Sequence, residues 1–110
     1  MKKLFFVLLV VINNVAFTQE KAITTFILIR HAEKDLTQST NDPDLSTEGK
    51  SHAARLVGVL MKTDIQAIYS TPFRRTQQTV EPLATAKAVQ VIAYQANKTD
   101  EIDNMLKQHA

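Results

Sequence analysis

The sequence contains no cysteine among its 110 residues. Without a thiol the chain can form no disulfide, no thiolate metal site and no cysteine nucleophile. It also lacks the residue that bacterial lipoprotein export requires. The length allows one small domain and not two, and its core must be held without covalent cross-links.

The chain also lacks an excess of positive or negative charge once its first few residues are left out of the count. The chain has 13 basic and 11 acidic residues, and two of the basic ones, Lys2 and Lys3, lie at the very start. The rest of the chain is therefore nearly neutral. Nucleic-acid-binding domains usually present a basic face, so the composition gives no argument for a nucleic-acid partner.

The apolar run over residues 4–12 is too short to span a bilayer, because a membrane-spanning helix needs about 20 residues. Two lysines precede the run and small residues around Ala16 follow it, which is the pattern of a secretory signal peptide. We expect residues 1–19 to be a signal peptide and 20–110 to be the domain. The mature protein would then be periplasmic or extracellular, without stable membrane association. The alternatives are an uncleaved anchor and a buried strand.

Apolar periodicity in the rest of the chain alternates between strand and helix. Residues 23–30 form a continuous apolar run that is typical of a strand buried on both faces. Ser46 is the expected N-cap of the first helix, and Pro82 is expected to kink or interrupt the second. The expected order is strand, helix, strand, helix, strand, helix, over residues 23–30, 47–60, 67–70, 73–88, 89–93 and 99–109.

This order predicts an α/β fold, with a mostly parallel sheet in a three-layer α/β/α arrangement. A chain of this length is expected to lack the last strands of such a sheet. The expected third strand and last helix would then miss their partners. A short gene fragment that does not fold stably is therefore one reading of the sequence.

Polar residues follow the first two expected strands. Arg30 and His31 end the first, and the segment from Ser70 to Arg75 ends the second. Because functional groups of open α/β sheets gather at the carboxyl ends of strands, we expect these residues to share one pocket. Guanidinium groups bind phosphate oxygens, and a histidine beside them could attack phosphorus.

These residues carry a family resemblance. The segment LIRHAEK (28–34) resembles the signature of the histidine phosphatase superfamily, also called phosphoglycerate mutase-like. The segment LSTEG (45–49) resembles its "L-[ST]-x-x-G" helix start, and IYSTPFRRTQQT (68–79) resembles "xxSSPLxRAxQTA". The three segments occur in the family's order and at its spacing. The resemblance implies a metal-independent phosphatase that needs no cofactor.

The resemblance assigns roles to individual residues. His31 matches the nucleophile, and Arg30 and Arg75 match the two phosphate-binding arginines. Glu33, in the loop after the nucleophile, is a further candidate for substrate binding. Arg74 occupies a variable position and is expected to face outward.

Two family elements have no clear counterpart. A second histidine should follow a late strand, and the only later candidate, His109, follows a polar helical segment without a glycine. The second element without a clear counterpart is the acid that donates a proton to the leaving group. Asp100 and Glu101 lie in the expected region and are the candidates, although an acidic first helical turn, which the helix dipole favours, is the better explanation of them.

Three other polar residues are interpreted structurally. His52 is expected on the surface of the first helix, and Asp42 and Asp44 are expected to form a turn around Pro43. No metal-ligand spacing occurs in the sequence.

The sequence therefore predicts a phosphatase that hydrolyses a phosphomonoester or a phosphohistidine through a phosphohistidine intermediate. The partner would be a small phosphorylated substrate or a phosphoprotein. The alternative is a non-catalytic or vestigial phosphate-binding domain without the second histidine. Neither the substrate nor the oligomeric state follows from the sequence.

Overall fold

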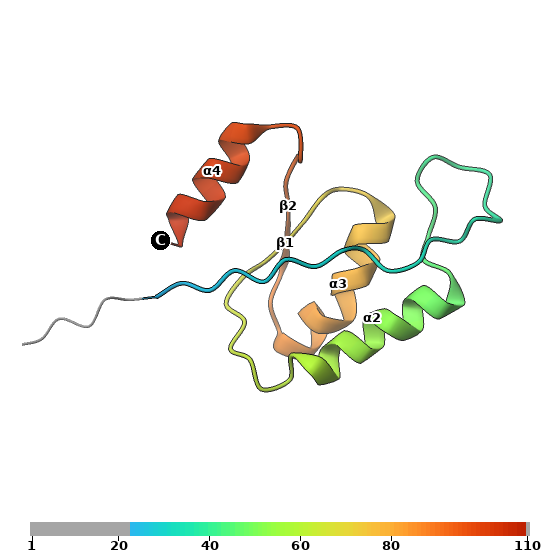
Figure 1. Ribbon diagram of the computed structural model, residues 1–110, viewed down its shortest axis with the longest axis horizontal. Helices are drawn as coiled ribbons and strands as arrows, with labels where there is room; N and C mark the ends of the chain where they lie inside the picture. The colour runs from blue at the N-terminus through green and yellow to red at the C-terminus, as the bar shows by residue number, and fades with distance from the viewer. Residues whose placement is uncertain (1–22, 110) are drawn as a thin grey trace, which may run out of the picture.

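The computed structural model describes residues 23–109, and the predicted signal peptide lies outside them (Figure 1). Helices and short strands alternate along the chain, as the sequence predicts. The elements are α2 (Thr47–Val59), β1 (Ile68–Ser70), α3 (Arg74–Lys87), β2 (Val91–Ala93) and α4 (Thr99–Gln108). No helix within this part of the chain is long and apolar enough to cross a membrane.

The two strands form a parallel pair, in which Ile68 lies opposite Val91 and Ser70 opposite Ala93. Parallel strands need a crossover connection, and α3 supplies it. The predicted α/β class with parallel pairing is therefore confirmed.

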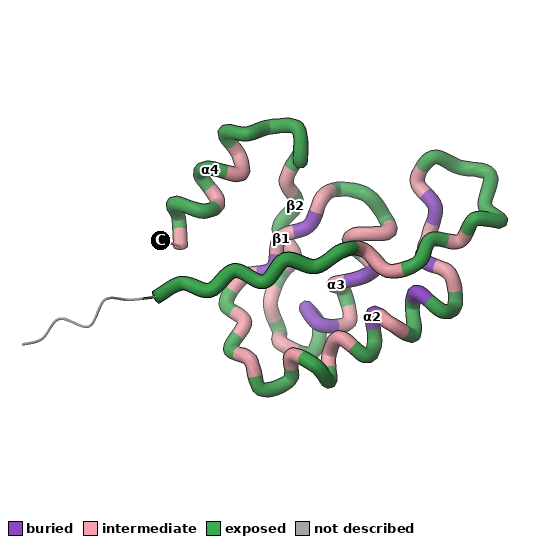
Figure 2. Tube along the Cα trace, viewed as in Figure 1, coloured by how far each residue is buried: buried purple, intermediate pink, exposed green. Residues whose placement is uncertain are grey.

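The core lies where α3 meets the strands and α2. Its most buried members are Ile68, Leu83 and Ala84. Partly buried apolar residues of both helices, of β2 and of the segments that flank the strands pack around them: Leu56, Val57, Leu60, Ile65, Val80, Val89 and Val91. The purple segments of Figure 2 mark the buried positions of α2, α3 and β1.

Two local expectations for the helices can be compared with the structure. Ser46 caps α2, and its hydroxyl accepts a hydrogen bond from Gly49 N at 3.0 Å. Helix α3 continues through Pro82 instead of restarting there. The predicted interruption is therefore wrong, because the packing of Thr79, Leu83 and Ala84 against the core maintains one helix on both sides of the proline.

The expected first strand is not formed. Residues 23–30 run extended and exposed, with Leu28 95% and Ile23 89% accessible (Figures 1 and 2). An apolar run becomes a buried strand only where neighbouring strands and covering helices enclose it. Residues 23–109 form a sheet of two strands, β1 and β2, which does not include this segment.

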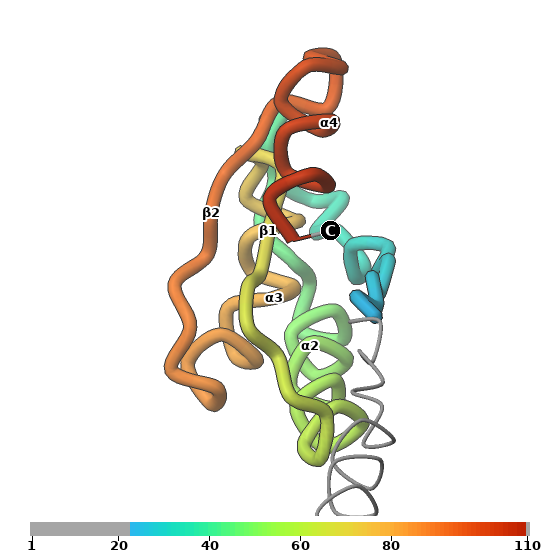
Figure 3. Tube along the Cα trace, turned by 90° about the vertical axis from the view of Figure 1, so that its left-hand side faces the viewer, coloured from blue at the N-terminus to red at the C-terminus, as the bar shows by residue number. Residues whose placement is uncertain are grey.

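Figure 3 shows α4 beyond the ends of the two strands, next to the end of the described chain. Its C-terminal residue His109 contacts Tyr69 of β1, and the Tyr69 hydroxyl lies 2.6 Å from His109 Nε2. The Thr24 hydroxyl donates to the carbonyl of the same histidine.

The two glycines of α2 provide a test of this packing. A Cβ at Gly49 would lie 2.3 Å from the carbonyl oxygen of Glu33, whereas a Cβ at Gly58 would have no atom within 4 Å. We predict that Gly58→Ala stabilises the protein by about 1 kcal/mol, since alanine favours helix over glycine. Gly49→Ala should instead destabilise it, because the clash involves backbone that cannot move freely. Urea unfolding of both variants measures the two changes in stability. If both variants were stabilised equally, the close approach of the Glu33 backbone to Gly49 would be contradicted.

Candidate active site

The segment that carries His31 is attached to helix α3 by one buried hydroxyl. Ala32 N donates a hydrogen bond to Thr79 Oγ1 at 2.9 Å. The same hydroxyl donates to the carbonyl oxygen of Arg75, one turn earlier in α3, at 2.6 Å. Thr79 is 4% exposed, so both bonds are shielded from water. The nucleophile candidate is thereby held one residue away from a fixed point on α3.

The next residue is fixed to the start of α2. The carbonyl oxygen of Glu33 accepts from Ser46 N at 2.9 Å and from the Ser46 hydroxyl at 3.3 Å. Gly49 allows this approach, because any side chain there would strike the Glu33 backbone. Lys34 and Leu45 then form an antiparallel bridge at the base of the 35–44 loop, which projects from the fold in Figure 1.

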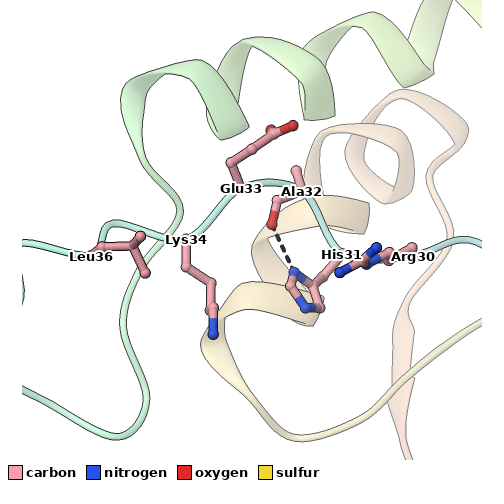
Figure 4. Close-up of a pocket in the computed structure, with 6 residues that line it drawn as sticks. All are labelled: Arg30, His31, Ala32, Glu33, Lys34 and Leu36. Carbon is pink, nitrogen blue, oxygen red and sulfur yellow. Dashed lines mark hydrogen bonds between the residues drawn. The ribbon is translucent and has the colours of Figure 1, made fainter.

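The imidazole of His31 has a defined hydrogen-bonding arrangement. Its Nδ1 lies 2.7 Å from the carbonyl oxygen of Ala32 (dashed in Figure 4). A carbonyl can only accept, so Nδ1 carries the proton. In the neutral ring the lone pair is then on Nε2, as is required of a nucleophile. His31 is half-buried, so the ring is partly screened but still reachable.

An open hollow surrounds His31. It is lined by six residues: Arg30, His31, Ala32, Glu33, Lys34 and Leu36. Figure 4 shows the side chains of Arg30 and Lys34 on the same side of the segment as the imidazole, whereas Glu33 points toward α2. The hollow therefore presents a histidine with two cations, a combination suited to an anion.

The Glu33 carboxylate forms an ion pair with His52 of α2, with Oε2 2.7 Å from Nδ1. The pKa of Glu33 lies below its ordinary value because its own backbone N–H and then His52 hydrogen-bond to the carboxylate. His52 is thus not the simple surface residue that we expected. The substrate-binding role of Glu33 stays a prediction, since its carboxylate is directed at α2 and not at the hollow.

The two adjacent arginines differ in their surroundings. Arg74 faces outward as expected, and its Nε lies 2.9 Å from Oδ1 of Asp44. The guanidinium of Arg75 stacks on the ring of Phe73, with Cζ 4.2 Å from the ring centroid. Arg75 is connected to the His31 segment through its carbonyl and Thr79, but it does not line the hollow. Its phosphate-binding role stays a prediction.

The predicted turn residues Asp42 and Asp44 contact α3. Asp42 Oδ1 accepts from Arg74 N at 2.9 Å, at the exposed start of the helix. Asp44 accepts from the side-chain amide of Gln78 at 2.6 Å, and the same amide's oxygen accepts from Leu45 N at 2.8 Å. These carboxylates therefore attach the 35–44 loop to α3.

The candidate proton donors Asp100 and Glu101 lie in the first turn of α4. Glu101 Oε2 accepts from Gln95 N at 2.8 Å, and Lys98 Nζ lies 3.7 Å from Oε1. Neither acid lines the hollow around His31. His109 ends the same helix and contacts Tyr69. The proton donor stays a prediction.

In the described part of the chain no group of three or more acidic or histidine side chains is placed to hold a metal ion.

Sequence reasoning missed Thr79 and Gln78 as residues that hold the site together. Thr79 is a buried residue of α3, but its hydroxyl gave no indication of its partner in the sequence. A polar residue on an otherwise apolar helix face is the signal that could have identified it, because a buried hydroxyl is nearly always hydrogen-bonded.

Fold and site together define an α/β domain with a histidine and cationic side chains gathered beside one helix. The model of the histidine phosphatase superfamily (branch 1) matches residues 26–103, and the chain belongs to this family. The resemblance noted in the sequence is thereby confirmed.

Two individual proteins are similar to the chain. Phosphoserine phosphatase 1 of Hydrogenobacter thermophilus is 39% identical over 83 residues, which are 71% of this chain and 38% of the relative. The structure of a mycobacterial glucosyl-3-phosphoglycerate phosphatase with inorganic phosphate has a TM-score of 0.51 at 24% identity. The match covers 70% of this chain and 42% of that protein. The chain thus spans less than half the length of either protein, and the structural likeness supports the fold alone.

The hydroxyl of Thr79 can be tested by isosteric replacement. Thr79→Val removes the acceptor of Ala32 N and leaves that donor unsatisfied, which should cost about 1–3 kcal/mol in the free energy of unfolding. Thr79→Ser keeps the hydroxyl and should be the milder change. Urea unfolding of both variants provides the measurement. A valine variant as stable as the serine variant would show that the bond is unimportant.

The lowered pKa of Glu33 predicts a pH dependence. Because the folded-state pKa is lowered, the stabilisation that the carboxylate provides is present above the ordinary value of 4.5 and is lost as the pH falls through the lower folded value. Glu33→Gln should therefore flatten the acid limb of stability against pH. Urea unfolding across this range, with the exposed Glu48→Gln as control, checks it. Identical acid limbs in wild type and Glu33→Gln would contradict it.

Proposed function

We propose that the protein is a metal-independent phosphatase that hydrolyses a phosphomonoester or a phosphohistidine through a phosphohistidine at His31. The observation that carries the proposal is the Nδ1–H bond of His31 to Ala32, which leaves Nε2 as the nucleophilic atom beside Arg30. Family membership and the similarity to phosphoserine phosphatase 1 support it.

The reaction has two displacement steps. In the first, Nε2 of His31 forms a bond to phosphorus while the ester P–O bond breaks, and the leaving oxygen takes a proton from an acid. In the second, water attacks phosphorus, the N–P bond breaks, and inorganic phosphate leaves. Arg30 and Arg75 would stabilise the charge on the transferring group, which is the main catalytic demand of phosphoryl transfer.

The neighbouring contacts support the first step. The ring must keep one orientation while the N–P bond forms. Two hydrogen bonds fix the backbone just after the histidine: Ala32 N donates to Thr79 Oγ1, and Ser46 N donates to the carbonyl oxygen of Glu33. The bond to Ala32 also keeps the proton on Nδ1, so the attacking nitrogen stays unprotonated in the neutral ring. Orientation of this kind is what converts a histidine into a nucleophile.

We propose further that the protein acts after export, in the periplasm or outside the cell. The support is the sequence of residues 1–19, with its two lysines and short apolar run. The partner would be a small phosphorylated substrate or a phosphoprotein. The nearly neutral charge of the remaining chain gives no support for a nucleic-acid partner.

The proposal predicts a labelled enzyme. The full-length protein, mixed with a phosphomonoester that carries radioactive phosphate and quenched rapidly, should yield an acid-labile and base-stable phosphoenzyme. His31→Ala should form none and should lose turnover by a factor of at least about 1,000. His109→Ala, a histidine removed elsewhere, should still be labelled. Phosphate binding without any phosphoenzyme in the wild type would contradict the proposal.

A further inference from the structure

The hollow around His31 is lined by one acidic residue, and the side chain of that residue is turned away from it. Glu33 lines the hollow together with Arg30 and Lys34. Figure 4 shows the Glu33 side chain directed toward α2, whereas the two cations lie on the same side of the segment as the imidazole. The direction of this one side chain therefore decides how much positive charge the hollow offers to a ligand.

A carboxylate inside the hollow would compete with phosphate. Arg30 and Lys34 take part in none of the three ion pairs formed between residues 23 and 109, so their charges are available to a ligand. A phosphoryl group carries a charge of about −2 at neutral pH, which these two cations match. One carboxylate between them would cancel about half of the positive charge and weaken the attraction for phosphate.

The backbone of Glu33 is fixed, but its side chain has room to rotate. Ser46 N donates to the Glu33 carbonyl oxygen and Gly49 lies against the same backbone, whereas the side chain is 50% exposed. Two hydrogen bonds keep the carboxylate beside α2. One comes from the backbone N–H of Glu33 itself, and the other joins Oε2 to Nδ1 of His52 at 2.7 Å.

The helix spacing brings His52 to this carboxylate. It follows Gly49 by three residues, so both lie on the face of α2 that the Glu33 segment crosses. An ionised carboxylate can only accept, so Nδ1 carries the proton, and the bond forms with a neutral as well as with a charged ring. The two side chains are 38% and 50% exposed, so burial does not hold the carboxylate in place. Removal of the histidine would release it.

We propose that His52 is a positioning residue of the phosphate site: it holds the carboxylate of Glu33 out of the hollow, so that the two cations remain free for phosphate. The proposal rests on the proposed function, which makes phosphate the ligand of the hollow. It adds a residue of α2 that does not itself line the hollow. Without this histidine, the released carboxylate pairs with Lys34 or Arg30, and phosphate binds more weakly.

Calorimetric titration of the full-length protein with inorganic phosphate at low ionic strength provides the test. His52→Ala should raise the dissociation constant about two- to fivefold, as expected for one screened charge at an exposed site. His52→Asn should stay close to the wild type, because the amide nitrogen of asparagine lies near the position of Nδ1 and can donate the same hydrogen bond. Arg55→Ala, which removes an exposed positive charge from the same helix, should leave the dissociation constant unchanged.

Removal of the Glu33 charge separates positioning from a general structural effect. In the His52→Ala background, Glu33→Gln should restore the wild-type dissociation constant, which a second loss of local contacts could not do. The inference is overturned if His52→Ala binds phosphate as the wild type does, if Glu33→Gln does not reverse the weakening, or if the wild type binds no phosphate. The titrations require no turnover, so absence of a phosphoenzyme would overturn only the phosphatase proposal.

Discussion

The site depends on the hydrogen bond from Ala32 N to Thr79 Oγ1. The segment before it, residues 23–30, is exposed and extended, and the loop after it is long and polar. The attachment to α3 therefore falls directly after the candidate nucleophile. Because Thr79 is buried and its hydroxyl is also fixed by Arg75 O, the acceptor has little freedom to move. The orientation of His31 follows from the position of α3.

The second constraint is the approach of the Glu33 backbone to α2. It combines three features: the missing side chain of Gly49, the capping hydroxyl of Ser46 and the side-chain pair of Glu33 and His52. Each belongs to the first turns of α2, so the helix start both ends the 35–44 loop and supports the site. The negative charge of Glu33 is drawn to α2 by this pair. The hollow around His31 is left with the cations Arg30 and Lys34.

The sequence predicted those parts of the fold that are determined locally. Periodicity located the helices, and the Ser46 hydroxyl identified the start of α2, because both depend on neighbours within a few residues. The buried strand over residues 23–30 and the interruption at Pro82 were predicted wrongly, since burial of an extended apolar run and tolerance of a proline are decided by tertiary packing. The same distinction between local and distant contacts applies to the residues of the site. His31 and Arg30 are adjacent in sequence and line one hollow, whereas the partners of Thr79 and His52 come from segments 47 and 19 residues away.

The difference between the two arginines shows why a motif alone does not define a binding pocket. Arg30 reaches the hollow because it directly precedes His31 in an extended segment. Arg75 lies in the first turn of α3, where its guanidinium packs on Phe73 and only its carbonyl is connected to the His31 segment. A stacked guanidinium keeps its N–H donors free at the ring edge, so the contact with Phe73 is compatible with phosphate binding. Movement of one flexible side chain would then complete the pair of arginines, whereas the histidine and its proton are already positioned by backbone contacts. The geometry thus separates a histidine that backbone contacts hold in place from an arginine side chain that is free to move.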